Sequence, residues 1–320
     1  MNPSVAGPTP RKPRGLCAAW RQIRRDRFLY ALAALPLLYF LIFSYLPMAG
    51  VIIAFKDYDP LQGIQGILRS DNFVGLLHFQ RFFRSIFFWD VLRNTVWINL
   101  LKLFWAFPAP ILLALLLNEV RHALFKRTVQ TIYYLPHFFS AVVVAGLVRA
   151  MLSSQGGLVN QLVAALGGQP AAFLTNPALF RSILVATAVW QNIGWSSIVY
   201  LAALTTISPE LYEAAAVDGA NRFQRAWHIT LPGISFAIVI NLIFALGGLL
   251  NADFEQILLL YSPSVYGVAD IIDTYVYRSG LLGRQYAYAA AVGLFKSLVA
   301  LILLLIANRA ARKAGQPGLW

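Results

Sequence analysis

The chain is built from long apolar runs separated by shorter polar intervals. Several runs reach or exceed the roughly 20 residues that a helix needs to cross a bilayer. The pattern therefore predicts an all-α, polytopic membrane protein with six transmembrane helices. The six predicted spans are Leu29–Phe55, Val91–Asn118, Thr128–Val148, Ser182–Leu204, Ile234–Ala252 and Gln285–Asn308.

Basic tails flank the predicted six-span domain, which extends over residues 28–308. Residues 1–27 carry seven Lys or Arg side chains and one acid, and the prolines among them favour disorder. The apolar run that follows is too long for the core of a cleavable signal peptide, so we expect the N-terminal segment to be retained and cytoplasmic. Residues 309–320 form the second basic tail.

The polar intervals differ in character. Lys56–Asp90 contains HFQRFFRSIFFW, which predicts an amphipathic segment at the membrane interface with Arg81 and Arg84 on its solvated side. Leu152–Pro177 lacks Lys and Arg, and its GGLVNQLVAALGG stretch predicts a short helix between glycines. Asp253–Arg284 is interpreted as an outer connection that carries four acids.

Composition supports the membrane assignment. The chain is 59% hydrophobic and 12% charged, which is too apolar for a soluble domain of this size. A net charge of +13 would suit a nucleic acid partner, but the basic residues flank apolar runs, so no nucleic acid is expected. The single cysteine, Cys17, excludes an internal disulfide and a cysteine-based metal cluster.

The distribution of charge predicts the orientation. The two tails, the loop after the second span and the loop before the fifth span carry fifteen basic residues. The three opposite connections carry six. The positive-inside rule then places both termini in the cytoplasm.

The loop before the fifth span has the signals of two short helices. Ser208 is a good N-cap, and Pro209 suits the first helical position. Gly219 suits the left-handed conformation that ends a helix, and Asn221 is a good cap for a second helix. Tyr212–Gly233 is therefore predicted to form a cytoplasmic helix-turn-helix.

This loop also carries the pattern Glu-Ala-Ala, three residues, Gly, nine residues and Ile-x-Leu-Pro. The pattern resembles the EAA loop of inner-membrane permease subunits of binding-protein-dependent ABC importers. The resemblance implies that residues of about 205–233 dock into a cleft on the ATP-hydrolysing subunit and pass its movement to the spans. The implied coupling residues are Glu213, Ala214, Ala215, Asp218, Gly219, Ala220, Ile229, Leu231 and Pro232.

The resemblance also implies the location and the partners. In the bacterial inner membrane, a second permease subunit, a distinct homologue, would complete the pathway, while two ATP-binding subunits contact the loops. An extracytoplasmic solute-binding protein would deliver the substrate, and ATP and Mg would bind only to the partner ATPase subunits. The block FEQILLLYSPSVYGVADIIDTYVYRSGL followed by YAYAAAVGLFKS resembles the branch that imports oligosaccharides, including alginate and uronate oligomers.

The sequence lacks the G-x-x-x-x-G-K-[ST] phosphate loop, and it lacks H-E-x-x-H, paired-cysteine and G-x-S-x-G signatures. We therefore expect a transport subunit and not an enzyme. Three alternatives remain: a polytopic membrane enzyme, an ion-driven secondary transporter and an ABC permease for peptides or amino acids. The first would need a catalytic constellation, and the second would favour inverted repeats and intramembrane acids.

Two lysines, Lys102 and Lys296, fall near the middle of predicted spans. None of the thirteen acids lies inside a span, so neither lysine is expected to have an intramembrane carboxylate partner. One interpretation is that each lysine extends to the interface or is satisfied by carbonyls. The other is that both line the pathway and offset the charge of an acidic saccharide.

Polar and aromatic side chains in spans four and five are further candidates for the pathway. Aromatic faces and amides suit sugars, although Ser and Asn equally join helices. On the fourth span, Asn192, Ser196 and Tyr200 share one stripe, and Gln191 and Trp195 share the adjacent one. The full set is Trp190, Gln191, Asn192, Trp195, Ser196, Tyr200, Asn241 and Asn251.

Overall fold

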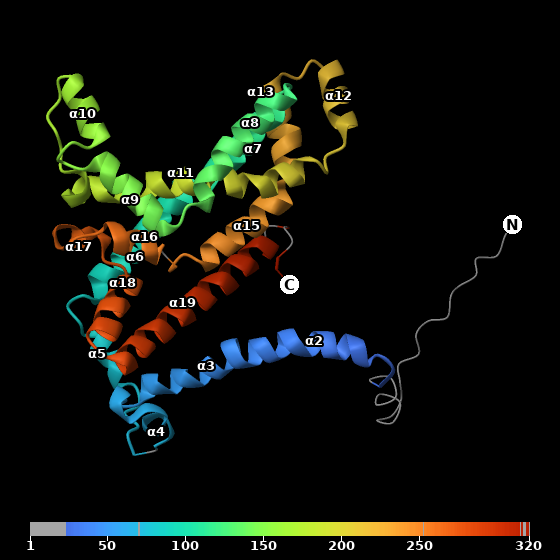
Figure 1. Ribbon diagram of the computed structural model, residues 1–320. Coiled ribbons are helices and arrows are strands. Elements are labelled where there is room, and N and C mark those ends of the chain that lie inside the picture. The colour runs from blue at the N-terminus through green and yellow to red at the C-terminus, as the bar shows by residue number, and fades with distance from the viewer. Residues whose placement is uncertain (1–23, 70, 252, 314, 316–317, 320) are drawn as a thin grey trace. The chain divides into compact units, whose positions relative to one another are not determined.

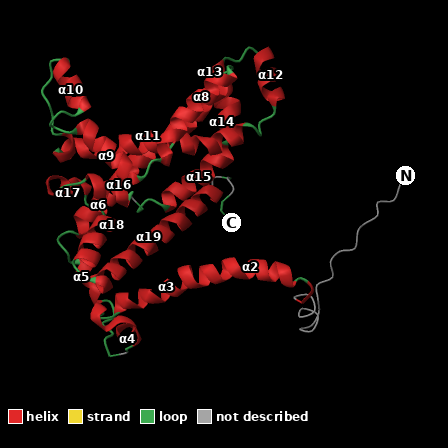
Figure 2. Cartoon of the chain, in the orientation of Figure 1, coloured by secondary structure: helices red, strands yellow, loops and turns green. Residues whose placement is uncertain are grey.

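The computed structural model describes residues 24–69, 71–251, 253–313, 315 and 318–319. Every regular element in these ranges is a helix (Figure 2), which confirms the predicted all-α class. Most of the N-terminal basic tail, including Cys17, lies outside the described residues, as does Ala252 at the predicted end of the fifth span.

The chain divides into two compact units, Met1–Ile52 and Ile53–Trp320. The described part of the first unit is a helical segment in which none of residues 27–48 is buried. Its surface is continuously apolar and requires lipid or protein cover. It consists of α2 (Arg27–Phe40), the π-helix η1 (Leu41–Tyr45), α3 (Leu46–Met48) and the first residues of the 3-10 helix η2 (Ala49–Phe55).

The second unit is organised around α11, which contacts both α6 and α7, and around α15 and α19, which lie side by side (Figure 1). The bounds of these five helices are Phe88–Ala106 for α6, Pro108–Glu119 for α7, Pro177–Leu204 for α11, Ser235–Gly247 for α15 and Tyr286–Lys313 for α19. Shorter elements are η3 (Pro60–Gln62), α4 (Gly63–Leu68), α5 (Leu77–Phe83), α10 (Leu158–Ala165) and η5 (Phe173–Thr175).

Within the described residues, three helical segments are long and apolar enough to cross a membrane: Arg27–Phe55, Phe88–Glu119 and Tyr286–Lys313. They match the predicted first, second and sixth spans. Two bent helix pairs raise the number to five if each pair is one span. The helix α11, at the predicted fourth span, is long enough at 28 residues but is less apolar than these three segments.

The third predicted span is not a continuous helix. Ala123–Phe138, which comprises α8 (Ala123–Tyr134) and η4 (Leu135–Phe138), meets α9 (Ala141–Leu152) at 102°. Pro136 has no N–H for a helical bond, and the side chain of Ser140 accepts a hydrogen bond from the N–H of Val143, which starts a new helix. The predicted third span, Thr128–Val148, is therefore bent in the structure and does not form one straight helix.

The predicted outer connection Asp253–Arg284 is largely packed structure. It folds into α16 (Phe254–Leu260), η7 (Pro263–Val265), α17 (Tyr266–Ala269), α18 (Ile272–Val276) and the π-helix η8 (Tyr277–Leu282). Its fully buried Ile257 and Ile271 share a cluster with Phe180 and Leu184 of α11. The predicted connection Asp253–Arg284 is therefore a folded part of the core, because its apolar residues pack against α11.

The amphipathic character predicted for the Phe-rich segment is present in α5, but its apolar face packs on protein. Phe82 is fully buried against Tyr275, Tyr288 and Phe295. Arg81 on the same helix is exposed. The apolar side of α5 therefore belongs to the core of the second unit.

Candidate functional site: an exposed helix pair and buried charges

The loop before α15 forms two helices joined by a tight turn. α12 comprises Pro209–Val217, and the turn that follows it contains Gly219. Gly219 has φ of +77°, the predicted left-handed conformation. The N–H of Ala220 bonds to the carbonyl of Ala215 at 2.8 Å, and the N–H of Gly219 bonds to that of Ala216 at 3.2 Å. These two bonds are the Schellman arrangement, which requires a left-handed residue at the position of Gly219.

The second helix starts as predicted at Asn221. The side chain of Asn221 accepts from the N–H of Gln224 at 2.9 Å, and the Gln224 side chain accepts from the N–H of Asn221 at 2.8 Å. This capping box opens α13 (Arg222–Arg225), which continues through η6 (Ala226–Thr230) and α14 (Leu231–Gly233). Ser208 occupies the N-cap position of α12 without a side-chain hydrogen bond, so its predicted capping bond is not formed.

The first helix of the pair has little cover. No residue of α12 is buried, and Glu213, Asp218 and Val217 are exposed, Val217 to 89%. Phe223 and Trp227 of the second helix stack on each other and are also exposed. Exposed apolar side chains beside two carboxylates are typical of a surface that binds another protein.

The other end of the pair is anchored in the core. Leu231 packs against a buried cluster that contains Ile111 of α7, Leu204 of α11 and Ile234. The Tyr212 hydroxyl lies 3.1 Å from that of Thr230, which joins the two helices of the loop. These contacts connect α12 with α7, α11 and α15.

Lys102 lies beside a cavity of 330 Å³ between α6 and the end of α15. Asn99 and Asn251 line the same cavity. The ammonium of Lys102 is 2.6 Å from Oδ2 of Asp253 and 3.2 Å from Oε1 of Gln256. Lys102 therefore has a carboxylate partner that lies outside the predicted spans, and Asn251 and Lys102 lie together.

Lys296 also has a partner that the sequence reasoning missed. Its ammonium donates to both carboxylate oxygens of Asp273, at 2.6 and 2.8 Å. The acids come from the segment Asp253–Arg284, which packs into the bundle and brings carboxylates to Lys102 of α6 and Lys296 of α19. Lys296 therefore also pairs with an acid from outside the predicted spans.

The same segment contains a buried acid, Asp270. It accepts from both terminal nitrogens of Arg278, at 3.1 and 2.6 Å, and from the hydroxyl of Thr274 at 2.7 Å. These bonds raise the pKa of the Arg278 guanidinium above its ordinary value. The spacing of Asp270, Thr274 and Arg278 at intervals of four residues was a readable signal, because residues four apart at the start of a helical segment come within hydrogen-bonding reach.

Several candidate pathway residues of α11 pack on the bend between α8 and α9. The His137 ring stacks on Trp195 at 4.6 Å, and its Nδ1 lies 3.1 Å from Oδ1 of Asn192. The Gln191 amide donates to the carbonyl of Phe139 at 3.2 Å. These contacts join helices, which was one of the two interpretations of this cluster.

The remaining candidates are scattered. Trp190 lines a mostly apolar cavity of 590 Å³, while Tyr200 is buried in the cluster around Ile111. Asn241 donates to the carbonyl of Ala237 in its own helix at 2.8 Å, and Ser196 is half-buried. The structure thus brings together Lys102 and Asn251, and separately Gln191, Asn192 and Trp195.

The same bend gives a stability prediction. A methyl group on the buried Gly194 would collide with the backbone carbonyl of Tyr133. We expect Gly194→Ala to lower the stability of the detergent-solubilised chain by roughly 1–3 kcal/mol, measured by thermal unfolding. Gly146→Ala is the matched control, because Gly146 is also helical and has no atom within 4 Å of the added carbon. Equal unfolding temperatures for both variants would contradict the packing at the bend.

Apolar helices long enough to cross a membrane, together with an exposed helix pair, are typical of a membrane protein with a surface for a protein partner. The family described as "Binding-protein-dependent transport system inner membrane component" matches residues 106–315. This chain belongs to that family, which confirms the resemblance carried by the Glu213–Pro232 pattern.

Relatives and solved structures extend the match to nearly the whole chain. The polygalacturonan/rhamnogalacturonan transport system permease protein YteP of Bacillus subtilis is 47% identical over 296 residues, which cover 92% of this chain and 91% of that protein. A chain of a bacterial ABC transporter involved in the import of the acidic polysaccharide alginate is 43% identical, with a TM-score of 0.85 over 92% of this chain and 98% of the other. A second structure, in complex with an alginate pentasaccharide-bound periplasmic protein, has a TM-score of 0.86 at 43% identity over 94% and 99%.

Proposed function

We propose that this chain is a transmembrane permease subunit of an ATP-driven importer that takes up acidic, uronate-type oligosaccharides. The observation that carries this proposal is the pair of independent similarities just described. One is to a permease named for polygalacturonan, and the other is to structures of an alginate importer. Both named polymers are acidic, and the chain aligns with these proteins over more than nine-tenths of its length.

The proposed topology has six spans within residues 28–308 and cytoplasmic tails at 1–27 and 309–320. It places the helix pair of residues 205–233 and both termini in the cytoplasm of a bacterial inner membrane. The excess of basic residues in the loops assigned to that side supports the orientation. The bent pair Ala123–Leu152, the helix α15 and the long α11 serve as the spans that length and hydropathy alone leave open.

The helix pair is proposed to couple transport to ATP hydrolysis on two partner subunits, which would hold ATP and Mg. Glu213 and Asp218 would make polar contacts in the cleft of the ATPase subunit. A distinct second permease subunit would complete the pathway, and an extracytoplasmic binding protein would deliver the oligosaccharide. The support is the exposure of α12 at one end of the loop and the burial of Leu231 at the other.

Inside the bundle, the cavity beside Lys102 is proposed to form part of the substrate pathway. Lys102, Asn99 and Asn251 offer one cation and two amides, which suit a carboxylate and sugar hydroxyls. Lys296 is proposed to act nearby through its pair with Asp273. We also propose that the pathway is lined by side chains of α11 and α15, namely Trp190, Gln191, Asn192, Trp195, Ser196, Tyr200 and Asn241.

The test is the ATPase activity of the complete complex reconstituted in liposomes with its binding protein. The substrates compared are uronate oligomers, neutral oligosaccharides and peptides of matched length. We expect stimulation by uronate oligomers. Stimulation by neutral sugars alone would replace the substrate class, and stimulation by peptides alone would favour the peptide-permease alternative.

A further inference from the structure

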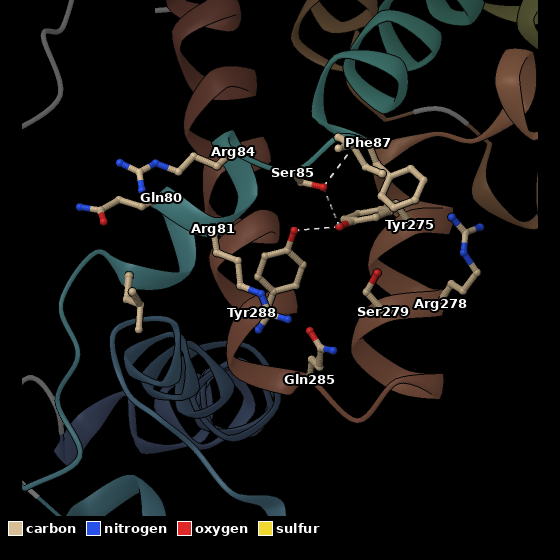
Figure 3. A pocket seen from close by; sticks show the side chains of 12 residues that line it. Gln80, Arg81, Arg84, Ser85, Phe87, Tyr275, Arg278, Ser279, Gln285 and Tyr288 are labelled. Carbon is tan, nitrogen blue, oxygen red and sulfur yellow. Dashed lines mark hydrogen bonds between the residues drawn. The ribbon is translucent and has the colours of Figure 1, made fainter.

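A cavity of 770 Å³ lies between α5, η8 and the first turn of α19 (Figure 3). Three arginines contribute to its lining, Arg81, Arg84 and Arg278, and no acidic residue does. Its volume falls within the range of about 300–1,000 Å³ that is typical of ligand pockets. The cavity is therefore large enough for a sugar residue and positively charged.

The positive charge comes chiefly from two of the three arginines. Arg278 is neutralised by Asp270, with which it forms two hydrogen bonds, and its guanidinium stacks over the Tyr266 ring at 4.8 Å. Among the described residues, neither Arg81 nor Arg84 forms a salt bridge. Both are exposed, so two guanidinium groups remain available to an anion.

Aromatic rings and hydroxyls form the rest of the wall. The Tyr275 and Tyr288 hydroxyls lie 2.8 Å apart, and the Ser85 hydroxyl is 3.5 Å from that of Tyr275 (Figure 3). The Arg81 guanidinium stands 5.3 Å from the centre of the Tyr288 ring, which orients it. Phe82, fully buried, contacts both tyrosine rings from the core side. The wall is thus preformed by packed side chains.

This combination matches the chemistry of a sugar acid. A guanidinium group binds a planar carboxylate with two parallel hydrogen bonds, and aromatic faces suit the C–H surface of a sugar ring. We propose that this cavity is a subsite for one uronate residue of an acidic oligosaccharide as the oligosaccharide enters the pathway. The inference rests on the proposed function, because it takes the substrate class and the orientation from it.

The proposed orientation places the subsite on the side where the binding protein delivers. α5 lies in the connection Lys56–Asp90, and η8 lies in the stretch Asp253–Arg284, both assigned to the outer side. The cavity by Lys102 is lined by other residues, from α6 and the end of α15. A uronate oligomer would therefore meet Arg81 and Arg84 before it reaches Lys102.

The test uses the complete complex in phosphatidylcholine liposomes, with binding protein loaded with trigalacturonate or with its carboxyl-reduced, neutral counterpart. The quantity measured is the concentration of loaded binding protein that gives half-maximal ATPase stimulation. For the Arg81→Gln/Arg84→Gln variant we expect this concentration to rise about tenfold with trigalacturonate, as loss of a charge-assisted hydrogen bond predicts. With the neutral oligomer it should stay unchanged. Arg81→Lys/Arg84→Lys should restore part of the affinity, because charge returns without the planar fork.

Arg93→Gln is the matched control, since Arg93 is an exposed arginine of the neighbouring α6 that lies outside the cavity lining. An equal rise with both oligomers, or no rise with either, would overturn the subsite. A wild-type complex that responds to no saccharide would instead refute the proposed function, so the two failures are distinguishable.

A second measurement is independent of activity. Phenylglyoxal labelling of the wild-type complex, read by mass spectrometry, should be slowed at Arg81 and Arg84 by trigalacturonate and unchanged at Arg93. If the labelling is instead slowed only by phosphatidylglycerol in the liposomes, the cavity holds a lipid phosphate and the uronate subsite is excluded.

Discussion

Gly219→Val is expected to abolish uptake while the complex continues to hydrolyse ATP. Gly219 has φ of +77°, a conformation that costs an L-residue about 1–2 kcal/mol and a β-branched residue more. Two hydrogen bonds of the turn depend on that conformation, one to Ala215 and one to Ala216. Valine would change the angle between α12 and the second helix, so movement of the ATPase subunits would no longer reach the core contacts of Leu231.

The measurement is the number of oligosaccharide molecules taken up per ATP hydrolysed in proteoliposomes. No atom lies within 4 Å of a carbon added at Gly219, so the effect comes from the backbone alone. Gly219→Asn is the matched control, because asparagine tolerates the left-handed conformation, and it should retain most of the uptake. A normal ratio in the valine variant would refute the coupling role of this turn.

Local features of the sequence predicted the helix pair closely. The left-handed turn at Gly219 and the cap at Asn221 depend on backbone conformation and on side chains three residues apart, both of which are readable in a single stretch. The ends of the longest apolar runs were similarly readable, and Phe88–Glu119 and Tyr286–Lys313 match them within a few residues of each boundary. In these regions the deciding interactions are local.

Features that depend on tertiary contacts were not predictable in this way. Asp253 and Asp273 lie in a polar stretch, and nothing in their own neighbourhood indicates that the stretch folds back onto Lys102 and Lys296. Burial of Ile257 and Ile271 drives that packing, and their partners lie on α11, far away in the sequence. The 102° bend at Ser140 is not readable from the sequence, because it depends on the packing of α8 on α11 and of α9 on α16.

The two lysine pairs respond differently to substitution because their acids differ in exposure. Asp273 has a side chain only 24% exposed, so Lys296→Ala would leave a largely buried carboxylate without its cation. We expect a stability loss of about 2 kcal/mol, below the cost of breaking a fully buried pair. Asp253 is 57% exposed, and Lys102→Ala should cost under about 1 kcal/mol. Thermal unfolding of the detergent-solubilised variants measures both losses.

Lys102 is therefore the position at which a role in transport can be separated from a role in stability. In the proposed pathway the substrate carboxylate replaces Asp253 beside Lys102, in the cavity lined by Asn99 and Asn251. Lys102→Ala is expected to lower the uptake of trigalacturonate about tenfold, since a hydrogen bond to a charged group is worth about 1.5–3 kcal/mol. Uptake of the carboxyl-reduced oligomer should change by less than about twofold, because that oligomer has no charge to pair.

Asp253→Asn is the informative companion to Lys102→Ala. It removes the carboxylate that competes for Lys102 but keeps the cation in the cavity, so trigalacturonate uptake should be retained or increased. If transport instead required the ion pair between Lys102 of α6 and Asp253 at the start of α16, both variants would lose uptake equally and for both oligomers. Opposite effects of the two substitutions, seen with the acidic oligomer alone, would identify Lys102 as the group that recognises its charge. Both substitutions remove the ion pair, but only Lys102→Ala removes the cation.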